Sequence, residues 1–187
     1  MSFARLGFVP VLGLLPLLGF GCSDPAPPTP RGAFTLSFVG GGSTCNTTGH
    51  GANLGVVSQD RKDEVLADGD GAVVECDVSG SGSFSVSGRA RDTANAEEIQ
   101  VTIDGITPQA SQAEPATGYI SFSSARTGGE VFVSDPDDPC RFWFTPGSQQ
   151  GVDAGKIWAV FECPRMLNEG YVCSIRGGVL AFDSCGL

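Results

Sequence analysis

The single histidine of the chain is the first residue to test for catalytic chemistry. His50 lies in a glycine-rich stretch, CNTTGHGAN, and serines are plentiful elsewhere. A Ser-His-Asp triad needs a base beside a presented nucleophile, and no serine lies in a G-x-S-x-G elbow. The run from Gly49 to Leu54 approaches a dinucleotide-binding loop, but Leu54 replaces its third glycine and no βαβ pattern surrounds it. We therefore predict no catalytic residue.

Two acidic stretches contain carboxylates that suit a cation. Asp68–Gly71 reads DGDG and Asp135–Asp138 reads DPDD. Calcium takes several oxygen ligands at fixed spacing, but Ala72 and Val73 replace a ligand and the turn glycine of an EF-hand, and no glutamate closes the loop. We predict solvated turns with no metal and no cofactor, and a weak structural Ca²⁺ as the alternative. A zinc site lacks ligands, because the chain has one histidine and no CxxC pair.

The cysteines predict a disulfide framework. An even set of cysteines in an exported chain favours pairing into bridges. Six remain when Cys22 is set aside: Cys45, Cys76, Cys140, Cys163, Cys173 and Cys185.

The pairing is only partly fixed by geometry. Two antiparallel strands at 140–145 and 155–163 match Cys140 with Cys163 and Arg141 with Glu162, which favours a Cys140–Cys163 bridge. Cys45–Cys76 is the next choice, and Cys173–Cys185 follows by elimination. That last pair conflicts with a hairpin turn at 177–178, which leaves the two cysteines too far apart for a bridge.

Trp143 and Trp158 form a candidate binding face. In the same register they lie diagonally on the face opposite the cysteines. Exposed aromatic rings stack on sugar rings or on the apolar side chains of a partner. The alternative is that a second sheet covers both rings, which leaves them a structural role.

Alternation of apolar and polar residues predicts the strands that position these side chains. Alternation with a period of two indicates a sheet that water wets on one face, and Gly, Asp and Pro clusters between the runs indicate tight turns. We predict an all-β fold, an antiparallel β-sandwich that is Ig-like or jelly-roll-like, with a flattened β-barrel as the alternative. The predicted strands lie at 34–38, 72–78, 84–90, 99–103, 120–122, 131–133, 140–145, 155–163, 171–176 and 179–183.

The net charge of the chain argues against one class of binding partner. The net charge is −10 and charged residues make up only 17% of the chain. An acidic surface repels phosphate backbones, so we predict no nucleic-acid partner.

The N-terminal segment has the features of an export signal. Residues 1–22 read MSFARLGFVPVLGLLPLLGFGC, with Arg5 followed by an apolar run that is short for a membrane span. Residues 23–31 read SDPAPPTPR, and such proline-rich chain favours an extended tether. We predict a leader at 1–21, Cys22 with a tether to 31, and a single β domain over 32–187.

This segment resembles bacterial lipoproteins that are cut before a lipidated cysteine. Gly21 and Cys22 match the motif, whereas Phe20 and Gly19 depart from it and Leu18 lies one position early. The resemblance implies membrane attachment through acyl chains on Cys22, and Ser23 after it implies the outer membrane, at its periplasmic face or at the cell surface. An ordinary secretory leader with a free Cys22 thiol is the alternative, followed by a plain membrane anchor.

Three functions remain open from the sequence. The first is a non-enzymatic envelope domain with a structural or ligand-binding role, for which a polysaccharide is one candidate ligand. The second is an envelope hydrolase that uses a pair of loop carboxylates, as glycosidases do. The third is a subunit held by an envelope protein partner.

Overall fold

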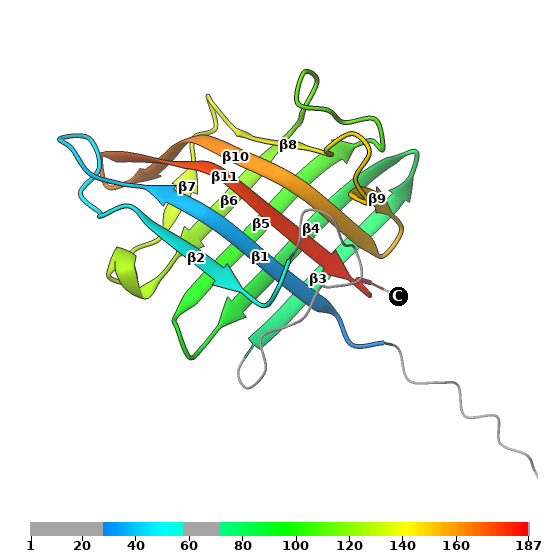
Figure 1. The fold of residues 1–187 in the computed structure, drawn as a ribbon, viewed down its shortest axis with the longest axis horizontal. Helices are drawn as coiled ribbons and strands as arrows, with labels where there is room; N and C mark the ends of the chain where they lie inside the picture. The colour runs from blue at the N-terminus through cyan, green and yellow to red at the C-terminus, as the bar shows by residue number, and fades with distance from the viewer. Residues whose placement is uncertain (1–27, 58–71, 187) are drawn as a thin grey trace, which may run out of the picture.

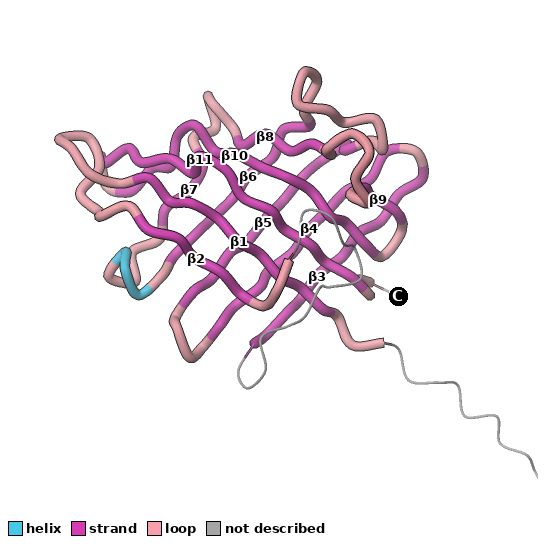
Figure 2. The backbone as a smooth tube through the Cα atoms, viewed as in Figure 1, coloured by secondary structure: helices cyan, strands magenta, loops and turns pink. Residues whose placement is uncertain are grey.

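Residues 28–57 and 72–186 are described by a computed structural model, and they form one antiparallel β-sheet. The predicted all-β class is confirmed: besides the strands, these residues contain only a short 3-10 turn, η1 at Ala125–Thr127 (Figure 2). The strands are β1 (Arg31–Val39), β2 (His50–Leu54), β3 (Ala72–Ser81), β4 (Ser83–Asp92), β5 (Glu97–Ile106), β6 (Ala116–Ser123), β7 (Phe132–Ser134), β8 (Cys140–Trp143), β9 (Gly151–Asp153), β10 (Lys156–Asn168) and β11 (Tyr171–Asp183).

The sheet folds back on itself into two layers. The strand order is β2-β1-β11-β10-β7-β6-β5-β4-β3, and β8 also joins β10 to β6. Figure 1 shows β2, β1, β11 and β10 in one layer, crossing β3 to β6 of the other layer at a large angle. The short strands β7 and β8 therefore form the corner where the sheet changes layer.

Alternating side chains build the core between the layers. On β1 the side chains of Phe34, Leu36 and Phe38 are buried, whereas Thr35 and Ser37 are exposed, as the alternation predicts. The runs predicted at 84–90 and 99–103 show the same pattern in β4 and β5. Burial of these apolar faces supplies most of the driving force for folding.

Aromatic rings fill the core, and glycines make room for them. The ring of Phe38 lies 5.4 Å from that of Phe122 and 5.1 Å from that of Phe132. A Cβ at Gly88 of β4 would lie 2.6 Å from the ring of Phe182, and one at Gly32 of β1 would lie 2.8 Å from the same ring. The Phe182 ring therefore packs directly on the backbone of both layers.

The predicted pairing of the two cysteine-bearing strands is confirmed. In β8 and β10, Phe142 lies opposite Phe161 and Arg141 lies opposite Glu162, and their side chains form an ion pair of 3.2 Å. Cys140 is bonded to Cys163, with 4.2 Å between their Cα atoms.

The other two predicted disulfides are wrong. Cys45 is bonded to Cys173, and Cys76 is bonded to Cys185. The pairing of β1 with β11 brings the segment after β1 to Cys173, where the Val172 N–H donates to the Thr44 carbonyl at 2.6 Å. The turn predicted at 177–178 is also wrong, because both glycines lie inside the continuous strand β11. Cys173 and Cys185 therefore lie at opposite ends of one extended segment, far beyond bonding distance.

A disulfide and single hydrogen bonds protect the two edges of the sheet. Exposed strand edges are sites of unwanted pairing, and β2 and β3 each have only one strand neighbour in the sheet of described residues. The β3 edge is joined to the other layer by Cys76–Cys185 and by a backbone hydrogen bond from Gly155 to Val78 of 2.8 Å. At β2, the Asn53 N–H donates to the Glu97 carboxylate at 2.8 Å.

The three disulfides indicate that this domain resides in an oxidising, extracytoplasmic compartment. Within the described ranges, no helix has the length and apolar character needed to cross a membrane. The leader, Cys22 and the acidic stretch Asp68–Gly71 lie outside the described residues.

Candidate functional site

The outward face of β3 to β6 carries an ordered array of polar side chains. Strand pairing places Asp77 opposite Ser87, Ser87 opposite Thr102, and Thr102 opposite Tyr119. These four exposed residues form one row across four strands, which we call the hydroxyl row. Successive residues of the row are separated by the strand spacing of about 4.8 Å, so the row spans about 14 Å.

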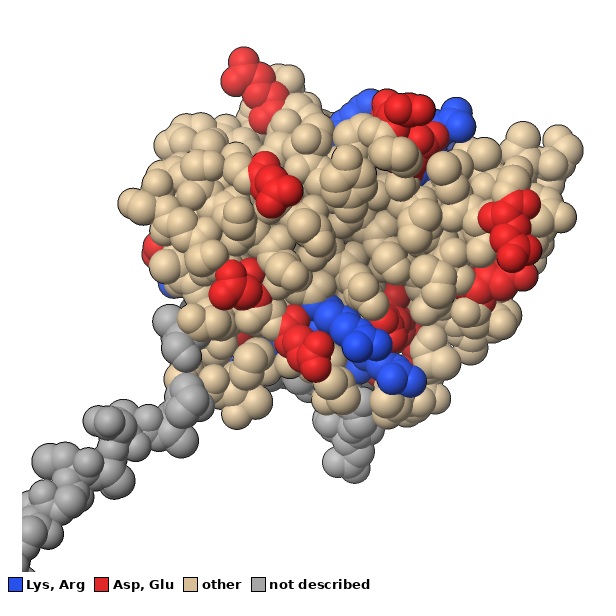
Figure 3. Space-filling model, turned by 180° about the vertical axis from the view of Figure 1, so that it is seen from behind, with Lys and Arg blue, Asp and Glu red and all other residues tan. Residues whose placement is uncertain are grey.

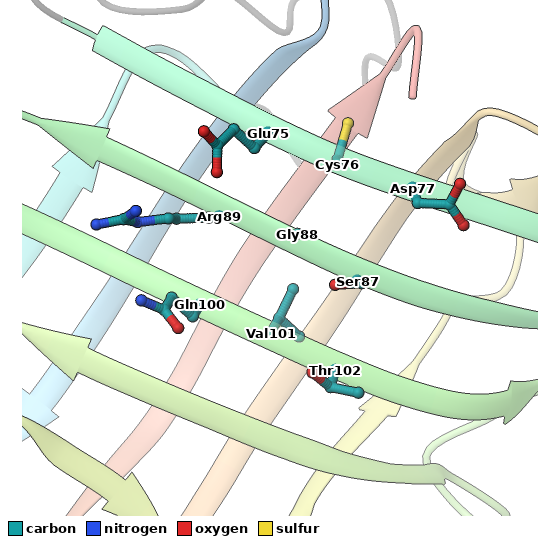
Figure 4. A pocket seen from close by; sticks show the side chains of 9 residues that line it. All are labelled: Glu75, Cys76, Asp77, Ser87, Gly88, Arg89, Gln100, Val101 and Thr102. Atoms are coloured by element: carbon teal, nitrogen blue, oxygen red, sulfur yellow. The ribbon is translucent and has the colours of Figure 1, made fainter. Parts of the chain in front are cut away.

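A second row lies beside the first. Glu75 is paired with Arg89, and Arg89 with Gln100. Figure 4 shows both rows on β3, β4 and β5, with Cys76 and Val101 pointing toward the opposite layer. The two rows exist because alternate residues of each strand point outward and the register of β3 to β5 aligns them.

The two rows line an open hollow, the polar groove. Its volume is about 540 Å³, and the polar side chains that line it are Glu75, Asp77, Ser87, Arg89, Gln100 and Thr102. A second hollow of about 230 Å³ is lined by Asp104, Thr117, Tyr119 and Pro139, and it shares Thr102 with the first. The two hollows therefore meet at Thr102, and the groove leads toward the exposed ring of Tyr119.

Glu98 fixes two side chains of the groove. The Arg89 guanidinium donates to both Glu98 oxygens, at 3.0 and 3.1 Å, and the Gln100 amide donates to the same carboxylate at 2.8 Å. The hydrogen bond from Arg89 lowers the pKa of Glu98, so the carboxylate stays charged. Side chains held in place before a ligand arrives lose less entropy on binding.

Most of this layer's outward surface is neutral. Figure 3 views the molecule from behind and shows scattered acidic residues, with basic side chains beside acidic ones in the lower centre and at the upper edge. Ion pairs of this kind include Arg89 and Arg91 with Glu98, at 3.0 and 3.7 Å. Arg89 and Arg91 thus share the one carboxylate of Glu98, which offsets part of their charge.

His50 and Ser124 make a contact that the sequence analysis did not predict. The Nε2 atom of His50 lies 2.9 Å from the Ser124 hydroxyl, and Nδ1 lies 2.9 Å from the Thr48 carbonyl. The carbonyl requires a proton on Nδ1, so the hydroxyl donates to Nε2 when the ring is neutral.

This pair resembles a nucleophile and its base, but it is closed to substrate. Ser124 is 1% exposed and His50 is 7% exposed. The Ser124 oxygen also accepts from the Thr127 N–H at 3.2 Å, as the N-cap of η1. His50 further packs between the rings of Phe38 and Phe122. The pair therefore holds β2 to the end of β6.

Trp143 and Trp158 do not form an exposed pair of rings. Trp158 is 1% exposed and packs with Ala33, Val179 and Ala181, while Trp143 is half-buried. The indole N–H of Trp158 has no hydrogen-bond partner within the described residues. Trp158 is therefore buried, but the residues that it packs with belong to β1 and β11 of its own layer and not to a second sheet, which was the alternative from the sequence.

The acidic turn at Asp135–Asp138 is held by hydrogen bonds within the protein. The Asp135 carboxylate accepts from the Arg165 guanidinium at 2.7 Å and from the Asp137 N–H at 2.9 Å. These bonds lower its pKa. A carboxylate oxygen of Asp138 lies 3.4 Å from a guanidinium nitrogen of Arg141. The described residues contain no group of three or more His, Cys, Asp or Glu side chains suited to holding a metal ion.

The sequence analysis singled out none of the residues of this site, and Tyr119 is an example. It is 50% exposed, and its neighbours in β6, Gly118 and Ile120, are buried. The signal was present, since the buried Ile120 and Phe122 imply that Tyr119 and Ser121 face outward.

Comparisons with protein-family models, curated proteins and solved structures gave no match to this chain. The fold and the site together define a disulfide-stabilised, extracytoplasmic β domain with a polar groove on one layer.

Proposed function

We propose that this chain is a lipid-anchored protein of the bacterial outer membrane, whose β domain is a non-enzymatic binding module. The acyl chains on Cys22 supply the anchor, since two or more buried chains hold a protein stably at a membrane. The proline-rich tether holds the domain away from the bilayer. Three disulfides support export of the domain into an oxidising space.

The polar groove is the observation that carries the binding role. Ligand sites are concave and present a few convergent polar groups held in place by a rigid scaffold. The groove has a volume of about 540 Å³, lies on three adjacent strands, and has Arg89 and Gln100 fixed by Glu98.

For the finer fold, we favour the sandwich over the flattened barrel. The two layers face each other across a shared aromatic core, and β2 and β3 are joined by no strand pairing in the sheet of described residues. Crossing of the layers at a large angle is the orthogonal mode of sheet packing, in which strands pass from one layer to the other at corners.

Photo-crosslinking in cells tests the binding role. A photoreactive phenylalanine replaces Tyr119 in the full chain, and the same replacement at Tyr171, the other exposed tyrosine, is the matched control. We expect an adduct with an envelope macromolecule from position 119 and none from position 171. Equal adducts from both positions, or none from either, would contradict a binding role for the groove.

Replacement of the anchoring cysteine tests the membrane attachment. The Cys22→Ala variant is expected to leave the outer-membrane fraction, and the wild-type protein is expected to incorporate a labelled fatty acid. A wild-type protein without label, or a variant that stays in the membrane fraction, contradicts the proposed anchor.

A hydrolase is the second candidate, because two carboxylates lie in the groove. Glu75 and Asp77 are two residues apart on β3, so their Cα atoms are about 6.6–6.8 Å apart along the strand. In inverting glycosidases the two catalytic carboxyl groups are about 6.5–9.5 Å apart, so side chains on such neighbouring positions could reach this distance. Figure 4 shows the two carboxylates pointing away from each other, which disfavours attack on one shared bond. New reducing ends during incubation with polysaccharide, lost in Glu75→Gln, would favour the hydrolase.

A further inference from the structure

We propose, building on the binding role above, that the polar groove binds a neutral, linear glycan that lies across the strands along the hydroxyl row. The chain of sugars extends from Asp77 on β3 past Ser87 and Thr102 to Tyr119 on β6, whose ring stacks on one sugar face.

The shape of the surface fits an extended ligand. The two hollows share Thr102, so they are adjacent along the row, and an extended ligand can contact both. The hydroxyl row spans about 14 Å by the spacing of strands, which suits a short run of linked sugars better than a single ring.

The chemistry of the row matches sugar hydroxyls. The hydroxyls of Ser87 and Thr102 both donate and accept, and the Asp77 carboxylate accepts. The Gln100 amide nitrogen donates to Glu98, and its oxygen is an acceptor for which the described residues supply no donor. A sugar presents hydroxyls that donate and accept in the same way. The apolar face of a sugar ring is matched by the exposed ring of Tyr119, which lines the same hollow as Pro139.

The charges in the groove select against acidic glycans. Glu75 and Asp77 are exposed and negative, and Asp104 lines the adjoining hollow. Among the described residues, the cation that lines the groove is Arg89, and its guanidinium donates to both oxygens of Glu98. Uronic-acid or sulfated polymers would therefore meet like charges, and neutral chains would not.

Calorimetric titration of the full mature chain, purified in detergent, tests this proposal. The probes are neutral hexasaccharides of β-linked glucose, α-linked glucose and β-linked N-acetylglucosamine, and polygalacturonate is the acidic comparison. We expect at least one neutral hexasaccharide to bind, with an affinity that salt leaves unchanged, and polygalacturonate to show no binding.

Three variants assign the binding to the row. Tyr119→Ala is expected to weaken the affinity about tenfold, the typical loss for an exposed aromatic anchor at a binding site. Thr102→Val keeps the size of the side chain and removes its hydroxyl, and a loss of about threefold or more is expected. Tyr171→Ala is the matched control and should bind as the wild-type protein does. Unchanged thermal unfolding shows that each variant is folded.

Four outcomes overturn the proposal. The first is binding to polygalacturonate alone. The second is neutral-glycan binding that survives both Tyr119→Ala and Thr102→Val. The third is an absence of all glycan binding while the crosslinker at position 119 captures an envelope protein. This result would contradict the glycan ligand but would agree with the proposed binding role. The fourth is an absence of both glycan binding and crosslinking, which removes the binding module as well.

Discussion

The Nε2 atom of His50 lies 2.9 Å from the Oγ atom of Ser124, and this contact ties the edge strand β2 to the 3-10 turn that follows β6. Both residues are buried, and 74 positions separate them in the chain. Because the same Ser124 oxygen caps η1, the pair joins the two layers at a point where no strand pairing does so.

Removal of the Ser124 hydroxyl is expected to destabilise the fold. Ser124→Ala leaves the His50 nitrogen without its partner and removes one of the two acceptors of the Thr127 N–H, which keeps the Ser124 carbonyl, at a cost of about 1–3 kcal/mol in the free energy of unfolding. Urea unfolding measures the change, and Ser85→Ala on the exposed face of β4 is the control, with an expected effect within about 0.5 kcal/mol. Equal stability of the two variants would show that the contact contributes nothing.

Acid is expected to weaken the turn between β4 and β5 through Asp92. Its carboxylate accepts hydrogen bonds from the side chain and backbone of Asn95 and from the backbone of Ala94, and these bonds lower its pKa. A carboxyl group with a lowered folded pKa stabilises the fold above its unfolded pKa, and this stabilisation is lost as the pH falls through the folded value.

Asp92→Asn measures this contribution. The variant should be less stable than wild type by about 1–2 kcal/mol at neutral pH, because an amide nitrogen replaces one acceptor oxygen. The difference should shrink below about pH 4, the ordinary range for an aspartate. Chemical unfolding at several pH values gives the comparison, with the exposed Asp104→Asn as control. A difference that is constant with pH contradicts the assigned role.

Loss of the Cys76–Cys185 bridge is expected to open one edge of the sheet. The bridge joins residues 109 positions apart, and it stabilises the fold mainly because it restricts the unfolded chain. Its loss is expected to lower the free energy of unfolding by about 4–5 kcal/mol. In the double variant Cys76→Ala/Cys185→Ala, amide exchange should rise in β3 before it rises in β5. Uniform exchange across all strands would show that the bridge does not act locally.

Two adjacent glycines of β11 are expected to respond in opposite ways to alanine. A Cβ at Gly178 would collide with the Phe161 ring, whereas one at Gly177 would meet no atom within 4 Å. Gly178→Ala should therefore cost about 1–3 kcal/mol by overpacking. Gly177→Ala should be neutral or should stabilise by up to about 1 kcal/mol, because it restricts the unfolded chain. Similar effects of the two changes on thermal unfolding would contradict this packing.

The strands were predictable because alternation is a local property. The exposed Thr35 and Ser37 between buried phenylalanines could be identified from neighbours in the sequence, and so could the pairing of Arg141 with Glu162 across two short strands. The glycines at 177 and 178 misled the prediction, since glycine serves a turn and a close ring contact equally well. The two disulfides that were wrongly predicted join residues 128 and 109 positions apart, and local patterns do not reveal such pairings.

The candidate site was not predictable in the same way. The hydroxyl row depends on the register of three strand pairs. Asp77 and Tyr119 therefore lie on the same surface only after β3 to β6 have assembled. Trp158 shows the converse: an outward-facing residue of β10 is covered by long-range packing with Ala33 and Ala181. Local alternation assigns a face of the sheet, and it does not say which face remains open.

Hydrogen–deuterium exchange of the full mature chain, measured with and without envelope polysaccharide, tests the binding face most directly. Peptides from β4, β5 and β6 should exchange more slowly when the polysaccharide is present, and peptides from β1, β10 and β11 should be unchanged. Protection confined to β10 and β11 around Trp158, or no protection anywhere, would contradict the assignment of ligand binding to the polar groove.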